Sequence, residues 1–334
     1  MANTQAQDPF HKAMAEANCS PLWERYDVTT NKPPPSGYVW HWKTMDPLIE
    51  QAIKATTMEN AERRVLTLDN PFLAGTGKDG AALNMSVNLQ VLMPGEKARP
   101  HRHLMNALRF ALEGDGAVSI VNGKPCPMLR GDMVLTPGMT WHCHEHTGKK
   151  RAVWVDALDV PLHGYLETRL FEPGPAHDMP TLPPDSAFGA VGFTPASGFD
   201  LPYSPIFRYP WENAVKALAA MPEGPDGSRR LRYTNPLTGG PAMASLDCFL
   251  VSLKKGRATA PRRSTSNTVA VVVEGEGTAT ISDETLSWER NAVVSCPSNA
   301  WTSFRATSEE AILFEITDRD ILARLGLLKD EFRT

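Results

Sequence analysis

The apolar positions of the chain fall mainly into short runs that read as β-strands. Val, Ile, Leu, Phe and Thr dominate these runs, and Pro, Gly, Asn or Asp follows each of them. In the first half of the chain the runs cover residues 65–68, 85–93, 118–121, 132–136 and 151–158. Asn122-Gly123, the strongest short hairpin signal, follows one of them. Short strands at this spacing, without long helices between them, predict a barrel or a sandwich.

Two N-terminal stretches have helical periodicity instead. They cover residues 8 to about 23 and residues 47 to about 64, and the second places Leu48, Ile49, Ala52 and Ile53 on one face. The sequence KPPPSG at residues 32–37 predicts an extended linker between them. We therefore expect residues 1–63 to form a helical arm that is not part of a barrel and packs on one, or on a neighbouring subunit.

The strand pattern returns after a long interruption. Residues 162–235 are rich in Pro, Gly and aromatic residues, with one predicted helix at 211–220, and read as a connecting segment. Further strands are then predicted at residues 246–253, 268–273 and 292–295. This organisation predicts a first barrel at residues 64–161 and a second barrel with a C-terminal helix at residues 236–334.

Two matches between the barrels indicate an internal duplication. The sequence EGDG at residues 113–116 matches EGEG at 274–277, an offset of 161. The segment from Thr136-Pro137 to Trp141 matches Cys296-Pro297 to Trp301, an offset of 160. A nearly constant offset across two separate motifs is typical of a repeated unit.

Three histidines of the first barrel are spaced for a metal centre. His101 and His103 are two positions apart, so on a strand both imidazoles point to the same side. His142 follows the strand at 132–136 and can reach the same point in a small barrel. Three imidazoles with open coordination positions suit a divalent metal that performs chemistry. At the matching positions the second copy has Arg262, Ser264 and Thr302, so only the first barrel is expected to bind metal.

Composition narrows the class of protein. The chain of 334 residues is 42% hydrophobic and 22% charged, typical of a soluble globular protein with about two domains. A net charge of -4 gives no support for nucleic-acid or membrane binding, and no apolar run approaches the length of a membrane span. The N-terminus lacks the apolar core of a signal peptide. The five cysteines are scattered without a CxxC pair, which favours a reducing cytoplasm.

The motifs resemble those of the cupin superfamily. Its first motif, G-x5-HxH-x3,4-E-x6-G, is met by Gly95, His101, His103 and Gly114, and its second, G-x5-PxG-x2-H-x3-N, by Gly131, Pro137 and His142. The glutamate position of the first motif is Ala107 or Leu108, so the usual fourth ligand is missing. A three-histidine set resembles the cupin dioxygenases that bind Fe(II). The resemblance implies a mainly β fold of two cupin barrels, each a double-stranded β-helix or jelly roll.

A narrower resemblance covers most of the chain. The ERRVL, HRH-ALRF, TPxxTWHxH and DALDVPL segments together are similar to gentisate 1,2-dioxygenases and to their relatives acting on salicylate and 1-hydroxy-2-naphthoate. The resemblance implies a cytoplasmic homotetramer that acts in the catabolism of aromatic compounds. Leu104-Met105-Asn106 departs from the more polar residues that gentisate enzymes carry after HRH. This departure leaves open which ring substituent the substrate carries.

The resemblance also implies roles for individual residues. His101, His103 and His142 are the expected iron ligands. Arg109 is expected to bind the substrate carboxylate, and Arg64 to assist it, although the adjacent Arg63 leaves the register open. The remaining expected site residues are His144 toward the phenolic oxygen, Asp156 in support, and Met105 and Trp141 against the substrate. The role of His146 stays open.

The chemistry is reasonable on physical grounds as well. An ortho-hydroxybenzoate can chelate an iron held by three histidines and leave a position for O2. Arg109 lies in an otherwise apolar strand, where an arginine needs a partner, either a substrate carboxylate or a core acid such as Asp156. The predicted activity is ring cleavage between the carboxyl- and hydroxyl-bearing carbons, with gentisate as first choice and salicylate or a substituted salicylate as second. Two alternatives remain: another cupin metalloenzyme, such as an isomerase or a diketone-cleaving enzyme, and a non-enzymatic binding protein.

Overall fold

The computed structural model describes residues 8–19, 21, 24, 36–58, 63–74, 80–189, 193, 195–196 and 201–333. Contacts divide the chain into two units, residues 1–34 and 35–334. The first contains helix α1 (Pro9–Glu16), whose N-terminus is capped by the Asp8 carboxylate. The helix predicted up to about residue 23 ends earlier, because Asn18 takes a positive φ of 53° and a proline follows at position 21. Residues 20, 22 and 23 of that prediction lie outside the described part.

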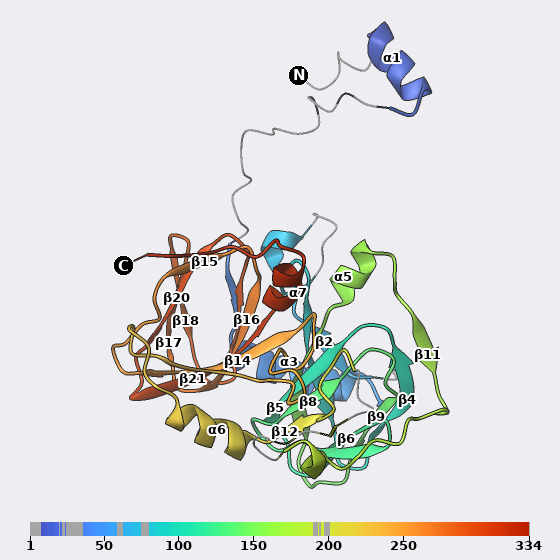
Figure 1. Ribbon diagram of the computed structural model, residues 1–334, viewed down its shortest axis with the longest axis vertical. Helices are drawn as coiled ribbons and strands as arrows, with labels where there is room; N and C mark the ends of the chain where they lie inside the picture. Colours follow the sequence, from blue (N-terminus) through green and yellow to red (C-terminus); the bar gives the residue numbers. More distant parts are fainter. Residues whose placement is uncertain are drawn as a thin grey trace. The chain divides into compact units, whose positions relative to one another are not determined.

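The second unit consists of two β-barrels, each made of two antiparallel sheets (Figure 1). The six-stranded sheet of the first barrel has the order β12-β8-β5-β10-β3-β2, and the five-stranded sheet has the order β11-β4-β9-β6-β7. The strands are β2 (Val65–Thr67), β3 (Ser86–Leu92), β4 (Lys97–His103), β5 (Ala107–Glu113), β6 (Ala117–Val121), β7 (Lys124–Pro127), β8 (Met133–Thr136), β9 (His142–His146), β10 (Ala152–Leu158), β11 (Phe171–Pro173) and β12 (Arg208–Tyr209). This architecture confirms the predicted two-barrel, mainly β fold.

The sheets of the second barrel have the orders β1-β19-β16-β21-β14-β13 and β18-β17-β20-β15-β22. Their strands are β1 (Tyr38–Trp40), β13 (Arg229–Arg232), β14 (Asp247–Lys254), β15 (Arg262–Ser264), β16 (Thr268–Glu274), β17 (Gly277–Ile281), β18 (Glu284–Trp288), β19 (Val293–Cys296), β20 (Trp301–Ala306), β21 (Glu310–Thr317) and β22 (Asp330–Phe332). None of the described helices combines the length and apolar character needed to cross a bilayer.

Strand register confirms the duplication. His101 pairs with His142 between β4 and β9, and Arg262 pairs with Thr302 between β15 and β20. A register shift interrupts the pairing of β5 with β10 in the first barrel, and another interrupts the pairing of β16 with β21 in the second. The two copies therefore share their strand order and pairing down to single residues, which makes position-by-position comparison valid.

The two barrels pack through the outer faces of their six-stranded sheets. Phe110 on β5 and Phe314 on β21 are fully buried, and their rings stack with centroids 4.1 Å apart. One hydrophobic core cluster includes Leu108 and Phe110 of the first barrel with Phe314 and Ile316 of the second. An aromatic pair of this kind contributes about 1 kcal/mol beyond the burial of its area. Alternate residues of β5 therefore serve this interface, and the residues between them face the interior of the first barrel.

The end of the predicted N-terminal arm takes part in the second barrel. Residues 38–40 form β1, which pairs with β19, contrary to the expectation that the arm lies outside the barrels. Helix α3 (Trp42–Ala55) follows and begins five residues before the predicted start at Pro47. The helix starts early because its N-terminus is capped by a distant residue, Glu289 of the second barrel. The Glu289 carboxylate accepts a hydrogen bond from the Trp42 N–H (2.9 Å) and lies 2.8 Å from His41 Nδ1.

The segment between the barrels contributes edge strands to both of them. β11 pairs with β4, β12 pairs with β8, and β13 pairs with β14. Its helices are α5 (Val160–Tyr165), the short η3 (Asp185–Ala187) and α6 (Trp211–Ala220), the last of which has the predicted bounds. Near the C-terminus, α7 (Arg319–Arg324) precedes β22. The connecting segment is thus more regular than its Pro- and Gly-rich composition predicted.

Candidate active site

Three histidines meet inside the first barrel. His101 and His103 point inward from β4, and His142 faces His101 from the neighbouring β9. One nitrogen of each ring lies within 4.8 Å of the corresponding atoms of the other two, and all three residues are buried. The ring centroids of His101 and His142 are 4.1 Å apart. The structure thus brings the three predicted metal ligands together.

Backbone carbonyls fix the orientation of all three rings. The Nδ1 atoms of His101, His103 and His142 lie 2.8–2.9 Å from the carbonyl oxygens of Arg99, Met105 and Thr140. Because a carbonyl only accepts, each Nδ1 carries the proton and each Nε2 keeps a free lone pair. The Nε2 atoms of His101 and His142 are buried without a partner among the described residues. This donor set fits a divalent metal ion held by three neutral imidazoles.

Burial keeps these imidazoles in the ligand form. Desolvation lowers the pKa of His101 to about 3 and of His103 to about 4, and holds the pKa of His142 well below its usual value. Neutral histidine is the form that binds a metal ion. The site is therefore ready to bind metal at neutral pH without first losing protons.

A buried ion pair lies across the interior from the histidines. Arg109 and Asp156 are paired between β5 and β10, with Arg109 Nε 3.7 Å from Asp156 Oδ1, and Arg109 Nη1 donates to Thr136 Oγ1. Burial lowers the pKa of Arg109 and raises the pKa of Asp156, while each charge opposes the shift of the other. Both Arg109 Nε and Asp156 Oδ1 lack a hydrogen-bond partner among the described residues. The pair therefore has capacity left for a polar ligand.

His144 lies beside the triad and has one nitrogen engaged. Its Nδ1 lies 2.9 Å from Ser119 Oγ, and its Nε2 is buried without a partner in the described part. The ring is 6.1 Å from that of His142 and 5.4 Å from that of Trp154, between centroids. Burial holds the pKa of His144 well below its usual value, so the ring is neutral. His144 can donate to or accept from a ligand placed next to the metal.

Two further interior residues were not singled out from the sequence. Gln90 on β3 lies opposite Trp154 on β10, and Gln90 Nε2 and Trp154 Nε1 are both buried donors with no partner among the described residues. The available signal was alternation along β3, which places Asn88 and Gln90 on one face of an otherwise apolar strand. Buried donors without partners on the same interior surface leave hydrogen-bonding capacity for a polar molecule.

The structure separates the two adjacent arginines. Arg64 is buried, and its guanidinium donates to both carboxylate oxygens of Glu96 (2.9 Å each) and to the carbonyl of Thr56. The positive charge of Arg63 instead contributes to the low pKa of His101 and of His103, and its guanidinium lies over the ring of Phe171, 5.7 Å from the centroid. Arg63, rather than Arg64, is therefore the second arginine near the histidines.

Trp141 and His146 lie apart from the interior polar groups. Trp141 directly precedes β9, and the Arg102 guanidinium lies over its ring, 4.7 Å from the centroid. This pair faces away from the triad. Both ring nitrogens of His146 are engaged, with the Lys150 carbonyl and the Gly148 N–H, which is a structural role.

Met105 lies in the turn between β4 and β5, where its carbonyl orients His103. Because β4 and β5 belong to different sheets of the barrel, the alternation of inward and outward side chains along β4 does not continue into β5. Arg109 and His103 consequently face each other from opposite sheets instead of sharing one strand face. Cys143 is half-buried and alternates on β9 with the inward His142 and His144, so its side chain points away from the triad.

Comparisons with known proteins agree with this geometry. The cupin domain matches residues 88–160. The chain is 33% identical to 5-aminosalicylate 1,2-dioxygenase of Comamonas sp. over 97% of this chain and 90% of that protein, and 33% identical to gentisate 1,2 dioxygenase 1 of Aquipseudomonas alcaligenes over 98% and 97%. The chain belongs to the gentisate 1,2-dioxygenase family. The structure of salicylate 1,2-dioxygenase from Pseudoaminobacter salicylatoxidans with bound gentisate superposes with a TM-score of 0.88 at 30% identity, covering 99% of this chain and 97% of that one.

Membership of the gentisate 1,2-dioxygenase family makes the chain a ring-cleaving oxidoreductase that carries a metal cofactor. Within the described residues, the triad is the one group of three or more His, Cys, Asp or Glu side chains suited to hold a metal ion. In the second barrel of this dioxygenase, Arg262, Ser264 and Thr302 stand at the matching positions. Among the described residues, the histidine triad therefore has no counterpart in the second barrel.

Proposed function

We propose that this chain is an Fe(II)-dependent dioxygenase that opens the ring of an ortho-hydroxybenzoate between the carboxyl- and hydroxyl-bearing carbons. Gentisate is the first-choice substrate, and salicylate or a substituted salicylate is the second. The observation that carries the proposal is the arrangement of three buried, neutral imidazoles opposite a buried guanidinium with a free donor. Metal ligands and a carboxylate-binding cation in one interior match a substrate that presents a carboxylate beside a phenolic oxygen.

His101, His103 and His142 would hold the iron through their Nε2 atoms. Iron(II), when bound there, supplies Lewis acidity and one-electron redox chemistry with O2. The three backbone carbonyls that fix the rings keep the ligand atoms aimed at one point before metal enters. A preorganised site of this kind avoids the cost of ordering its ligands during binding.

Arg109 would orient the substrate through its carboxylate. Its guanidinium presents a planar set of donors, and Asp156 and Thr136 hold that plane in one orientation. Arg63 would add a second positive charge from the side of Phe171. Two cations make the interior favourable for an anion, and burial strengthens the attraction by excluding water.

His144 would hold the phenolic oxygen or accept its proton. The ring is neutral, Ser119 fixes Nδ1, and Nε2 is free for the ligand. Gln90 and Trp154 supply further unpaired donors for a second ring substituent. Gentisate is preferred because it carries a second ring hydroxyl that could pair with such a donor and that raises the electron density of the ring. Nearly equal identity to the 5-aminosalicylate and gentisate enzymes leaves the choice of substituent to experiment.

We also propose a cytoplasmic homo-oligomer, with a tetramer as first choice. The five cysteines are all free thiols, which suits a reducing compartment. Tyr165 and Leu166 at the end of α5 are 86% and 55% exposed, which supports burial of this surface against another subunit. Light scattering coupled to gel filtration measures the assembly, and a monomer would contradict it.

Oxygen consumption by protein reconstituted with Fe(II) under anaerobic conditions tests the function. Gentisate, salicylate, 5-aminosalicylate and 1-hydroxy-2-naphthoate are offered in turn, and benzoate serves as the control that lacks the ortho hydroxyl. We expect one O2 consumed per ring-opened product with at least one ortho-hydroxy acid, none with benzoate, and none with Zn(II) in place of iron. Stoichiometric iron without oxygen uptake on any of these acids would contradict the proposal and favour an isomerase or a diketone-cleaving enzyme.

A further inference from the structure

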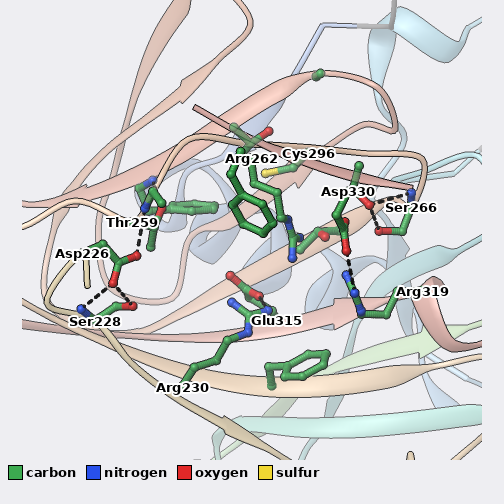
Figure 2. Close-up of a pocket in the computed structure, with 18 of the residues that line it drawn as sticks. Asp226, Ser228, Arg230, Thr259, Arg262, Ser266, Cys296, Glu315, Arg319 and Asp330 are labelled. Carbon is green, nitrogen blue, oxygen red and sulfur yellow. Dashed lines mark hydrogen bonds and ion pairs between the residues drawn. The ribbon is translucent and has the colours of Figure 1, made fainter. Parts of the chain in front are cut away.

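The second barrel contains a cavity of about 340 Å³. Ligand pockets in proteins begin at about this size. The cavity includes Arg262, Ser264 and Thr302, which stand where the first barrel has its three metal ligands. It therefore occupies the same place in its barrel as the metal centre does in the first. Figure 2 shows polar side chains from several strands converging on it.

The acid of the first site also has a counterpart here. Asp156 lies opposite Arg109 between β10 and β5, and Glu315 lies opposite Ala270 between β21 and β16. The position of Arg109 is thus occupied by Ala270 in the second barrel, and the cation Arg262 stands where the first barrel has His101. The acid keeps its position, as Asp156 in the first barrel and Glu315 in the second. The interior has lost its metal ligands and kept its charged character.

The acids that line this cavity are already engaged. Glu315 pairs with Arg230, and Asp330 accepts from Arg319 Nη2 at 2.8 Å. The third acid, Asp226, lies at the opposite end of the view from Arg319 (Figure 2), and its carboxylate accepts from Ser228 N, Ser228 Oγ and Ala260 N. Such pairing and capping leave the carboxylates little free acceptor capacity for a further cation.

Two guanidinium groups on this cavity have donors to spare. Arg262 lies between Cys296 and Asp330 and above Glu315, and no hydrogen bond or ion pair joins it to the described residues drawn in Figure 2. Arg319 Nη1 is buried and has no partner in the described part of the chain. A buried N–H such as Arg319 Nη1 is costly unless a ligand or water satisfies it. Arg262 is half-buried and can offer its donors to a ligand.

The remaining lining is apolar and partly aromatic. Phe249, Phe304 and Phe332 line the cavity together with Pro297 and Ala300. Phe304 is 4% exposed and Phe332 is 66% exposed, so the aromatic lining runs from the buried interior to an exposed strand at the C-terminus. Flat apolar side chains beside a cation favour a ligand that is itself flat and carries one negative group.

We propose that the cavity of the second barrel binds an aromatic monocarboxylate, with Arg262 as the main partner of the carboxylate. Arg319 Nη1 supplies a further donor, and the aromatic side chains pack on the ring. Besides the two ion pairs, the lining holds the opposite charges of Arg262 and Asp226. Because Asp226 accepts hydrogen bonds from Ser228 and Ala260, Arg262 is the cation left for one carboxylate. This site is separate from the metal centre and does not depend on the proposed ring cleavage, because it requires neither iron nor an ortho hydroxyl.

Titration calorimetry with benzoate tests the proposal on the full, metal-loaded chain. A background with Arg109→Met and Asp156→Asn removes the carboxylate partner of the first barrel without leaving Asp156 buried and unpaired, so that the remaining binding reports on the second. We expect one benzoate per chain in this background, and affinity at least about tenfold weaker when Arg262→Met is added. Benzamide, which has the same shape without the charge, should not bind.

Arg263→Met is the matched control, since Arg263 is the next residue on β15 and pairs with Glu331 on the exposed side. It should leave benzoate affinity unchanged. Arg262→Lys keeps a cation and should bind several-fold more weakly than Arg262, which keeps the test valid if Arg262→Met does not fold. Absence of saturable binding up to about 10 mM benzoate would overturn the proposal. Equal benzoate affinity in the Arg262 variants and in the double-variant background would overturn it as well.

Discussion

Arg109 and Asp156 face each other across strands β5 and β10 inside the first barrel, with Nε and Oδ1 3.7 Å apart. Arg109 is 2% and Asp156 6% exposed. A buried pair of this kind repays the cost of desolvation only while both partners are present. The pair therefore couples the stability of the barrel to the orientation of the guanidinium that we assign to the substrate.

Removal of one partner should cost more than removal of both. We expect Asp156→Asn to lower the free energy of unfolding by about 3 kcal/mol, because it leaves the Arg109 charge buried without its counterion. Arg109→Met combined with Asp156→Asn should be less destabilised than Asp156→Asn alone. Urea denaturation of the two single variants and the double variant measures this coupling. Additive losses would show that the two side chains do not stabilise each other.

Metal binding should depend on the inward side chains of β9 and not on the residue between them. His142→Ala should reduce bound iron by more than about tenfold, since two imidazoles remain of three. Cys143→Ala is the control, because Cys143 is the adjacent half-buried residue on the opposite strand face. Metal analysis after dialysis against a weak chelator gives the comparison. Equal iron in both variants would contradict the triad.

Variants of the two adjacent arginines should differ in effect: Arg64 variants should lose stability, and Arg63 variants should lose substrate affinity. Arg64→Met breaks a buried guanidinium–carboxylate pair with Glu96 and should lower the free energy of unfolding by about 3 kcal/mol. Arg63→Met should leave the melting temperature nearly unchanged and raise KM by about tenfold, because it removes only charge near the site. Thermal melts and steady-state oxygen uptake test both. A raised KM in Arg64→Met together with a lowered stability in Arg63→Met would instead make Arg64 the residue that binds substrate.

Acid should destabilise the metal-free chain through its buried histidines. Burial lowers the pKa of His101 to about 3, below the ordinary value of 6.5 that applies after unfolding. Between these values the unfolded chain binds a proton that the folded chain does not, so stability falls as pH falls from about 6.5 toward about 3. The slope from one such histidine is at most about 1.4 kcal/mol per pH unit. His101→Gln should reduce the measured slope between pH 7 and pH 5 by about 1 kcal/mol per pH unit, and an unchanged slope would contradict this account.

Local patterns along the sequence were sufficient for the two-barrel architecture but not for every strand. The strands that alternation and turn residues predicted, such as β3, β8, β14 and β16, lie within one or two positions of their expected bounds, because strand side chains alternate regardless of what they pack against. β17, β20 and β21 were not predicted. Asn122 and Gly123 both take a positive φ, as the predicted hairpin between β6 and β7 requires. Contacts from distant parts of the chain decided the rest, such as the start of α3 at Trp42, which depends on a carboxylate 247 positions away.

The sequence by itself determined which three histidines meet in the first barrel, because two share a strand face and the third belongs to a motif of fixed spacing. Only the tertiary structure decided between Arg63 and Arg64, since adjacent residues differ in their surroundings and not in their type. It also showed that Trp141 faces Arg102 and that Gln90 faces the interior, which depends on how two sheets close around one space. Spacing fixes which side chains share a face, and folding fixes what that face meets.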